Sequence, residues 1–246
     1  KVSTSGSTGV PFFLFQDKNK RQRNKADLIY FSKLCNYKIG DRLIELEVWR
    51  EHNKKNKIKS WMQNVLQFDV TKLTDARIIL FLTVLKKTKE RMTILGFASS
   101  YETICQYLDK NNISLKNLNL SSIIASSEYL NDYTRSKLKS YFNVPILSRY
   151  SNEEMGIIAH ETIYSSDYFV INHASYNVEI LDLEKDKPAK LGELGRIVIT
   201  DLFNFYMPLI RYDTGDIGRL SKEENGITKF EHIEGRKMDL IYDTQG

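Results

Sequence analysis

The sequence predicts an α/β protein: a parallel sheet with flanking helices, joined to a smaller, mostly antiparallel β subdomain. Between residues 94 and 150, short apolar runs alternate with longer segments of helical periodicity, and the connections are short. After residue 165, strand-like runs follow one another with glycine-rich turns and no helical period. We therefore expect an α/β subdomain over 1–164, a β-rich subdomain over 165–235 and a separate closing segment over 236–246.

The alternation between 94 and 150 is the clearest part of the pattern. "ILGFA" (94–98) is expected to be a buried strand, and Ser99 with Glu102 has the spacing of a capping box for the helix that follows. "LSSIIAS" (120–126) and "VPILSRY" (144–150) are the next expected strands, with a helix over 131–142 between them. The apolar faces expected for the two helices are Tyr101, Ile104, Cys105 and Leu108, and Leu130, Tyr133, Leu138 and Tyr141.

The region before residue 94 is less regular. Residues 18–36 predict an amphipathic helix whose apolar positions are Leu28, Phe31 and Leu34–Cys35, and 42–49 predicts a strand. The segments 58–66 and 76–88 fit either a helix or a strand, and this choice stays open. No segment approaches the roughly 20 apolar residues that a membrane-spanning helix needs.

Ligands of open α/β sheets bind beyond the carboxyl ends of the strands. In the predicted sheet, the residues at those ends are Ala98–Ser100, Ser126–Glu128 and Tyr150–Glu154. Small hydroxyl side chains, a tyrosine and carboxylates gather in these three segments. The fold prediction alone therefore points to them as the candidate site.

The composition excludes several classes of protein. The net charge of +5 is mildly basic, but the positive residues are concentrated in Lys18–Lys25 and Lys54–Lys59, which lack interleaved aromatic side chains. This pattern is typical of a solvated face and disfavours nucleic-acid binding. The two cysteines and four scattered histidines predict neither a disulfide framework nor a structural metal site. A reducing, cytoplasmic setting is expected.

The chain opens on a loop of small residues, "STSGSTGVP", which leads directly into the apolar run "VPFFLF". Backbone amides and hydroxyls of such a loop can converge on an anion, and small side chains let a phosphate approach the main chain. No Gly-Lys-Ser/Thr follows, so this is not a Walker A loop. A flexible linker is the alternative, and this stretch alone does not decide between the two.

Five segments in order along the chain resemble motifs of the adenylate-forming superfamily, the acyl-CoA synthetases and their relatives. Thr4 to Pro11 resembles the phosphate loop, and "ASSE" (125–128) lies where the family has a Gly-Ala-Glu-like segment against adenine. "RYSNEEMG" (149–156) resembles the Tyr-Gly-x-Thr/Ser-Glu motif. "LIRYDTGDIGRL" (209–220) resembles Tyr-Arg-Thr-Gly-Asp, and "EGRKMDLIYDTQG" (234–246) resembles the hinge segment. The late strands look most like the phenylacetate-CoA ligase branch, which includes CapK-like proteins associated with capsular polysaccharide loci.

The resemblance implies a role for each matched residue. Tyr150 offers an aromatic face to adenine, Glu154 holds Mg²⁺ between the ATP phosphates, and Asp216 accepts hydrogen bonds from the ribose hydroxyls. Arg236 reaches the ribose or the α-phosphate; with Glu154 it is a candidate catalytic residue. The further residues implied to bind the nucleotide are Thr4, Ser5, Gly6, Ser7, Thr8, Gly9, Ser127, Glu128 and Ser151. Those implied to contact the acyl substrate are Ser100, Tyr101, Tyr129 and Asn152.

The implied activity is ATP-dependent activation of a small carboxylic acid as an acyl-adenylate, followed by transfer to a thiol such as coenzyme A. ATP and Mg²⁺ are the implied cofactors, and no nucleic acid or membrane segment is expected. An aryl acid, a sugar acid and an amino acid are all compatible with the candidate pocket, and oligomerisation is left open. A place in capsular polysaccharide biosynthesis follows from the branch resemblance.

Several positions depart from the family pattern. Phe12 stands where many relatives have lysine, Ser151 replaces a glycine, Glu153 replaces threonine or serine, and Met238 stands at a hinge position. The zinc-binding insertion of some branch members is absent from this sequence. The chain also begins at an internal motif and ends at the hinge, so we expect it to be part of a longer polypeptide and to be inactive alone.

Two alternatives to the enzyme are carried forward. A catalytically decayed nucleotide-binding or assembly factor of the same fold would bind ATP or AMP without turnover, and Ser151, Glu153 and Met238 favour it. A nucleic-acid-binding protein would show an affinity that falls steeply with salt.

Overall fold

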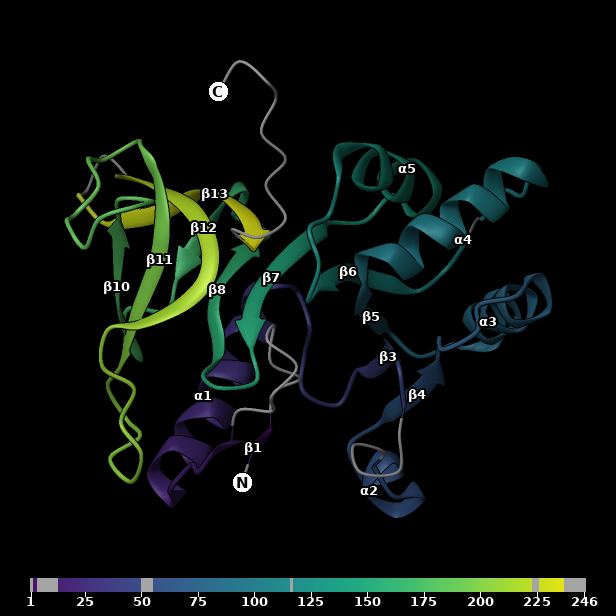
Figure 1. The fold of residues 1–246 in the computed structure, drawn as a ribbon. Coiled ribbons are helices and arrows are strands. Elements are labelled where there is room, and N and C mark those ends of the chain that lie inside the picture. Colours follow the sequence, from purple (N-terminus) through teal and green to yellow (C-terminus); the bar gives the residue numbers. More distant parts are fainter. Residues whose placement is uncertain (1, 4–12, 50–54, 116, 223–225, 237–246) are drawn as a thin grey trace. The chain divides into compact units, whose positions relative to one another are not determined.

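The structure is a computed structural model that describes residues 2–3, 13–49, 55–115, 117–222 and 226–236. The chain divides into two compact units (Figure 1). The α/β unit comprises Phe31–Arg149 with Thr162–Ser166, and the β unit comprises the chain up to Tyr30, Tyr150–Glu161 and the chain from Asp167 onward. The domain limits predicted from the sequence, at 165 and 236, stay a prediction.

The α/β unit is built on the parallel sheet that the sequence predicts, with strand order β7-β6-β5-β3-β4. Its strands are β3 (Arg42–Glu47), β4 (Val65–Asp69), β5 (Met92–Phe97), β6 (Leu120–Ser126) and β7 (Ile146–Asn152). Its helices are α2 (Lys57–Met62), α3 (Asp75–Lys87), α4 (Ala98–Lys110) and α5 (Asp132–Phe142). The two segments left open by the sequence contain α2 with the start of β4, and α3.

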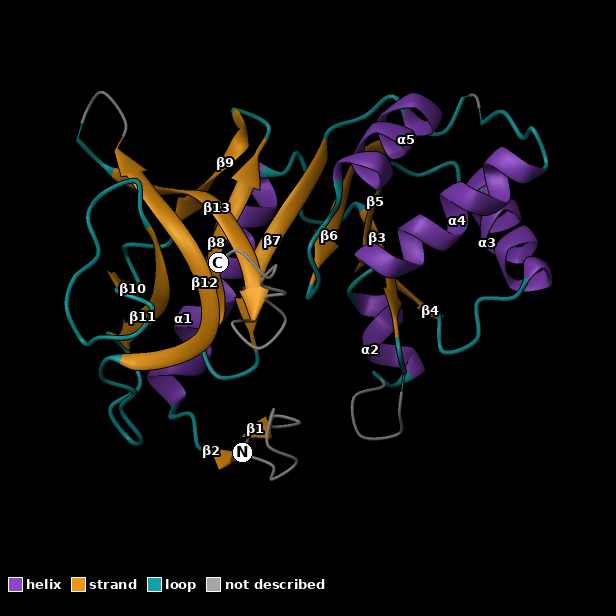
Figure 2. Ribbon diagram, turned by 45° about the horizontal axis from the view of Figure 1, so that its top comes forward, coloured by secondary structure: helices purple, strands orange, loops and turns teal. Residues whose placement is uncertain are grey.

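Helices α3, α4 and α5 lie along one face of this sheet (Figure 2). Strand residues Leu46, Ile94 and Ile123 pack against Phe81 of α3 and Ile104 of α4 in one apolar core. The opposite face carries a second, smaller cluster of Cys35, Leu95, Ile124 and Leu147. Both faces are buried, as parallel strands require, and this explains their nearly continuous apolar sequence.

Two details of the predicted helices are wrong. Helix α4 begins at Ala98 directly after β5, and its N-cap residue Phe97 makes no side-chain cap. Ser99 therefore lies inside the first turn rather than at the cap, and the capping box with Glu102 does not form. On the predicted face of the α5 segment, Leu130 and Leu138 are buried and Tyr141 is partly buried, but Tyr133 is 48% exposed and Thr134 is buried instead.

A cluster around Asp109 ties α4 to α5. Its carboxylate accepts hydrogen bonds from Lys137 Nζ at 2.8 Å, from the Tyr133 hydroxyl at 2.9 Å and from the Tyr141 hydroxyl. These bonds, led by the one from Lys137, lower the pKa of Asp109 to about 2. The exposed Tyr133 ring is thus retained for its hydroxyl rather than for its apolar surface.

The lowered pKa of Asp109 predicts acid sensitivity. A carboxyl group whose pKa is lower in the folded state stabilises the fold fully above its unfolded pKa of about 4, and this contribution disappears as the pH falls to about 2. The melting temperature of Asp109→Asn should therefore lie below that of the wild type at pH 6, and the gap should close toward pH 2. Asp132→Asn, at the start of α5, serves as the control. A gap that is constant with pH would contradict this account.

The strands of the β unit follow the order β10-β11-β12-β13-β9-β8. Its strands are β8 (Gly156–Thr162), β9 (Ser165–Ile171), β10 (Tyr176–Leu181), β11 (Leu194–Asp201), β12 (Tyr212–Lys222) and β13 (Thr228–Arg236). The pairs from β10 to β13 and on to β9 are antiparallel, as predicted. Met155, Ile158, Ile197, Ile199 and Phe230 are among the residues of its core. A short antiparallel pair, β1 (Val2–Ser3) with β2 (Phe13–Leu14), precedes the helix α1.

Helix α1 (Lys18–Leu34) differs from the predicted amphipathic helix in what it buries. Phe31 and Cys35 are buried as expected, but Leu28 is 47% exposed. In the β unit, the buried side chains of α1 are instead Lys20 and Asp27. The first part of the helix is therefore held by charged contacts, which an apolar-periodicity argument cannot detect.

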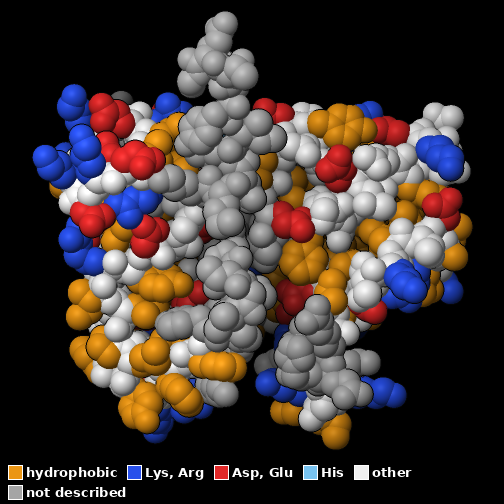
Figure 3. Space-filling model, viewed as in Figure 1, with side chains coloured by type: hydrophobic (Ala, Val, Ile, Leu, Met, Phe, Trp, Pro, Cys, Tyr) orange, Lys and Arg blue, Asp and Glu red, His pale blue; other side chains and the backbone are white. Residues whose placement is uncertain are grey.

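Exposed apolar side chains occur on the surface of both units (Figure 3). The short helix α2 buries no residue, and its Ile58, Trp61 and Met62 are largely exposed. Among the described residues, no helix is both long enough and apolar enough to cross a membrane.

Candidate functional site

Two segments of the β unit exchange hydrogen bonds between a tyrosine and a carboxylate. The Tyr150 hydroxyl donates to Asp216 Oδ2 at 2.7 Å, and the Tyr212 hydroxyl donates to Glu154 Oε1 at 3.1 Å. Each segment thus supplies a tyrosine and, four residues later, an acid that bonds the tyrosine of the other segment. This crossed arrangement brings together three residues that the sequence predicted for the site, Tyr150, Glu154 and Asp216.

The acid of the second segment is presented by a bulge in strand β12. Asp213 pairs with Val198 and Ile217 pairs with Arg196, so Thr214, Gly215 and Asp216 lie opposite the single residue Ile197. Gly215 has a φ of +77°, which a residue with a side chain adopts only at a cost. The bulge re-aims the side chain of Asp216 out of the strand, and this explains the Thr-Gly-Asp sequence.

The threonine of the bulge fixes its shape. Thr214 Oγ1 donates to the carbonyl oxygen of Ile197 at 3.0 Å and accepts from the Asp216 amide at 3.2 Å. Asp213 Oδ1 accepts from the Gly215 amide at 3.0 Å, and Asp213 is itself paired with Arg196 at 2.6 Å. The bulge is therefore held from both sides before any ligand binds.

We expect Thr214→Val, which removes only the hydroxyl, to loosen this bulge. Three hydrogen bonds of this hydroxyl are lost, those with Ile197, Asp216 and Tyr150, so the free energy of unfolding should fall by about 1–3 kcal/mol. ATP affinity should fall roughly 10-fold, because Asp216 is no longer held in place. Equilibrium urea unfolding and calorimetric ATP titration measure the two effects.

Thr200→Val is the matched control for this variant. Thr200 Oγ1 accepts from the Arg211 amide, just before β12, at 2.9 Å, and this hydrogen bond lies outside the bulge. It should lose stability without losing ATP affinity. Equal ATP affinity in Thr214→Val and the wild type would contradict the role given to Thr214.

Glu154 lies in the turn between β7 and β8, and this turn is held at several points. Asn152 Oδ1 accepts from the Met155 amide at 2.8 Å, and Gln16 Nε2 donates to the carbonyl oxygen of Glu154 at 3.1 Å. Glu154 is buried, with 9% of its surface exposed, while the neighbouring Glu153 is exposed. Of the two adjacent glutamates, the structure places the predicted one among the site residues. Asn152, predicted to contact substrate, uses its side-chain oxygen to shape the turn.

Both tyrosines keep their protons at neutral pH. Burial, and next the charge of Asp216, raise the pKa of Tyr150 well above its usual value. Burial, followed by the Glu154 carboxylate, raises the pKa of Tyr212 to about 12. Each hydroxyl therefore remains a donor to a carboxylate.

In the α/β unit, predicted site residues lie at the carboxyl ends of β5 and β6. Glu128 Oε2 accepts from the Ser99 amide at 2.7 Å, so this carboxylate supplies the cap that α4 lacks. Negative charge is favourable at a helix N-terminus. Ser127, between β6 and Glu128, has a φ of +69°, a backbone conformation that non-glycine residues rarely adopt. Strained residues of this kind cluster at ligand sites.

The residues predicted to contact the acyl substrate are placed unequally. Tyr101 is 2% exposed, and its hydroxyl donates to the carbonyl oxygen of Ile124 at 3.0 Å inside the core. Ser100 is also buried. Tyr129 is 56% exposed; Ser151, which was predicted to bind the nucleotide instead, is partly buried. The structure therefore gives Tyr101 a packing role, which argues against direct contact with substrate.

Part of the predicted site lies outside the described residues. This applies to Thr4, Ser5, Gly6, Ser7, Thr8 and Gly9, and to the departures Phe12 and Met238. For Arg236 only the backbone is described: it pairs with Asp216 across β12 and β13. This pairing places the last residue of β13 beside the bulge.

The donor set around Glu154 fits Mg²⁺ that arrives with a nucleotide. One carboxylate oxygen is bonded to Tyr212, and a carboxylate is the hard ligand that Mg²⁺ prefers. Within the described ranges, no three His, Cys, Asp or Glu side chains form a cluster that could hold a metal ion. Mg²⁺ is commonly bound by one or two carboxylates together with substrate phosphates rather than by a cage of protein ligands.

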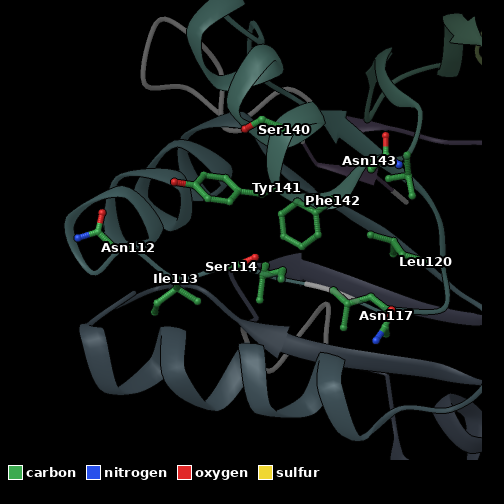
Figure 4. A pocket seen from close by; sticks show the side chains of 12 residues that line it. Asn112, Ile113, Ser114, Asn117, Leu120, Ser140, Tyr141, Phe142 and Asn143 are labelled. Atoms are coloured by element: carbon green, nitrogen blue, oxygen red, sulfur yellow. The ribbon is translucent and has the colours of Figure 1, made fainter.

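A cavity of about 810 Å³ lies elsewhere in the α/β unit (Figure 4). It is lined by the segment after α4 and the end of α5, including Ile113, Leu120 and Phe142. Leu120 is the first residue of β6, so this cavity lies toward the amino ends of the strands. It is thus at the opposite end of the sheet from Ser99, Ser127 and Glu128.

Several residues that build the site were missed by the sequence reasoning. Tyr212 and Thr214 lie within a quoted motif but received no role, and the four-residue spacing from tyrosine to acid in both segments was the available signal. Gln16 and Tyr176 reach the Glu154 turn from distant parts of the chain. No local pattern announces such contacts.

Comparison with known proteins places this geometry in context. No protein-family model matches the chain. Protein CapK of Staphylococcus aureus is 23% identical over 251 residues, covering 98% of this chain and 54% of CapK. A structure of 2-hydroxyisobutyryl-CoA ligase in complex with 2-HIB-AMP and CoA matches 99% of this chain with a TM-score of 0.76 and 17% identity. ATP-bound MatB from Rhodopseudomonas palustris matches 98% with a TM-score of 0.67 and 16% identity.

These comparisons confirm the fold class and the resemblance drawn from the five motifs. The chain has the fold of part of these ligases, and it is similar to CapK along nearly its whole length. It spans about half of each relative, 54% of CapK, 58% of the 2-hydroxyisobutyryl-CoA ligase and 48% of MatB.

Proposed function

From the shared fold and the chain-long similarity to CapK, we propose that this protein activates a carboxylic acid with ATP as an acyl-adenylate. The acyl group then passes to a thiol such as coenzyme A. The observation that carries the proposal is the crossed pair of carboxylates in the β unit, each bonded to the tyrosine of the other segment.

In this proposal, the two carboxylates divide the nucleotide between them. Asp216 accepts from the ribose hydroxyls, and its position in the bulge and its half-buried carboxylate support this role. Glu154 holds Mg²⁺, which neutralises phosphate charge when it is bound with ATP. Tyr150 presents its ring to adenine, and Arg236, which pairs with Asp216 through its backbone, contacts the ribose or α-phosphate.

In the proposed reaction, the protein itself forms no covalent bond with the substrates. An oxygen of the substrate carboxylate attacks the α-phosphorus of ATP, the bond from the α-phosphorus to the bridging oxygen breaks, and pyrophosphate leaves. A thiolate then attacks the acyl carbonyl and AMP leaves. In-line positioning and charge neutralisation supply most of the rate in such reactions.

The finer parts of the proposal rest on the resemblance of the motifs. The predicted phosphate loop, Thr4 to Gly9, and the adenine segment at Ser127 and Glu128 bind the nucleotide. A cytoplasmic reaction, where ATP and coenzyme A are available, and a substrate used in capsular polysaccharide biosynthesis complete the proposal. Its acyl substrate class is left open among aryl, sugar and amino acids.

Carboxylate-dependent exchange of labelled pyrophosphate into ATP tests the proposal in the full-length protein. We expect exchange with Mg²⁺ and at least one member of a panel of aryl, sugar and amino acids. ATP binding without exchange across the panel would instead support the decayed nucleotide-binding factor. Affinity for DNA or RNA that falls steeply with salt, with no ATP binding, would contradict both.

A further inference from the structure

A buried ion pair lies beneath the Glu154 turn and is not used by the proposed chemistry. Lys20 Nζ of α1 lies 2.7 Å from Asp201 Oδ2 at the end of β11, and neither side chain is exposed. Lys20 Nζ also donates to the Tyr176 hydroxyl at 3.0 Å at the start of β10. Three segments far apart in the sequence therefore meet at one charged centre inside the β unit.

This centre reaches the turn through one hydrogen bond with a fixed direction. A lysine ammonium group has donors only, so the Tyr176 oxygen accepts from Lys20 and its own proton must point elsewhere. It points to the carbonyl oxygen of Met155, the residue after Glu154. Burial raises the pKa of Tyr176 far above its usual range, so the hydroxyl remains a donor at any physiological pH.

Two consecutive backbone carbonyl groups of the turn, those of Glu154 and Met155, thus accept hydrogen bonds from outside the turn. Gln16 bonds the carbonyl of Glu154 and Tyr176 bonds the carbonyl of Met155, while Asn152 holds the Met155 amide. Gln16 and Lys20 come from the same short stretch of chain, at and just before the start of α1. The backbone that carries Glu154 is consequently anchored to α1, β10 and β11 rather than only to its own strands.

Stability alone does not account for this arrangement. Burying an ion pair costs desolvation that its attraction barely repays, and well-packed apolar residues of similar volume often serve as well or better. What such a pair does provide is a fixed geometry, because a misplaced partner would leave a buried charge unpaired. The desolvation cost of the ion pair is explained if the turn must be positioned to within a fraction of an ångström, as metal ligands require.

We propose that Lys20, Tyr176 and Asp201 act as positioning residues for Glu154. They hold the turn at 152–155 where its carboxylate can bind the magnesium ion that accompanies ATP. This role rests on the proposed function, since it presumes that Glu154 binds Mg²⁺. The three residues touch neither nucleotide nor metal in this role; they act through the backbone of Glu154 and Met155.

The test compares ATP affinity with and without magnesium in the full-length protein. Calorimetric titration of ATP in excess Mg²⁺ and in EDTA gives the factor by which Mg²⁺ strengthens binding. Tyr176→Phe, which removes only the hydroxyl, should reduce this factor roughly 10-fold or more, the usual effect of losing a group that orients a metal ligand. Affinity in EDTA should be unchanged, because the variant leaves the nucleotide contacts intact.

Ser175→Ala is the matched control at the same interface of α1 with β10. Ser175 Oγ accepts from Arg23 Nε at 2.6 Å and donates to Asp27 Oδ2 at 2.6 Å, so its loss loosens the same helix without touching the Glu154 turn. Ser175→Ala should lower the melting temperature at least as much as Tyr176→Phe and keep the full magnesium factor. A factor that falls in both variants in proportion to stability would overturn the proposal.

The background of Glu154→Gln separates positioning from packing. If Tyr176 acts through Glu154, adding Tyr176→Phe to Glu154→Gln should not lower the magnesium factor further. If Mg²⁺ strengthens ATP binding by the same factor in Tyr176→Phe as in the wild type, the positioning role is overturned and the proposed function stands. A wild-type protein that binds no ATP would overturn the proposed function, and the positioning role with it.

Discussion

Replacing Asp216 with alanine is expected to weaken ATP binding by roughly 10²–10⁴-fold. Hydrogen bonds to a charged group contribute about 1.5–3 kcal/mol each, and Asp216 is proposed to accept one from each ribose hydroxyl. The variant also deprives Tyr150 of its partner at 2.7 Å, so the aromatic face proposed for adenine loses its anchor. Calorimetric titration with ATP measures the loss.

A nucleotide analogue makes this prediction specific. For the wild type, 2′,3′-dideoxy-ATP should bind about as weakly as ATP binds to Asp216→Ala, and the variant should hardly distinguish the two nucleotides. Asp186→Ala is the control, because Asp186 pairs with Arg196 on the surface and lies outside the bulge. If the wild type and Asp216→Ala distinguish ATP from the analogue equally well, the proposed contact of Asp216 with the ribose is contradicted.

Glu154→Gln is expected to lower pyrophosphate exchange by roughly 10²–10³-fold while sparing ATP binding in EDTA. The amide keeps the size of the side chain and can still accept from Tyr212, so the fold should survive. What it loses is the negative charge that Mg²⁺ requires. Exchange measured against magnesium concentration, with thermal unfolding as the check on folding, tests this.

Glu153→Gln is the natural control, because it makes the same change one residue earlier. Glu153 is exposed, whereas Glu154 is buried and bonded to Tyr212. Exchange by Glu153→Gln should match that of the wild type. A loss of similar size in both variants would mean that the charge of the turn matters but that neither glutamate is the specific magnesium ligand.

The parallel sheet was predicted well because each buried strand is a short apolar run that can be recognised within its own segment of sequence. Strand β6 has the predicted bounds, and helix α5 lies within one residue of them. Errors arose where a contact from outside the segment decides the outcome. Ser99 looked like a cap, but α4 starts directly after β5, and its amide is bonded by Glu128 from the next strand end.

The candidate site was predictable only in part for the same reason. Tyr150, Glu154 and Asp216 lie in local motifs, and the structure brings all three together in the β unit. Tyr212 and Tyr176 act through pairings that join positions 58 and 21 residues apart in the chain, which no single segment records. Lys20 lies in a charged run that is typical of a solvated face, yet it is fully buried.

The fate of oxygen from the substrate tests the central claim most directly. With the acid identified by exchange and labelled with ¹⁸O in its carboxylate, the full-length protein is allowed to complete the transfer, and AMP is analysed by mass spectrometry. Acyl-adenylate formation predicts one ¹⁸O atom in AMP, because the carboxylate oxygen that attacks the α-phosphorus stays on it. AMP without label, or label found in inorganic phosphate, would contradict the account.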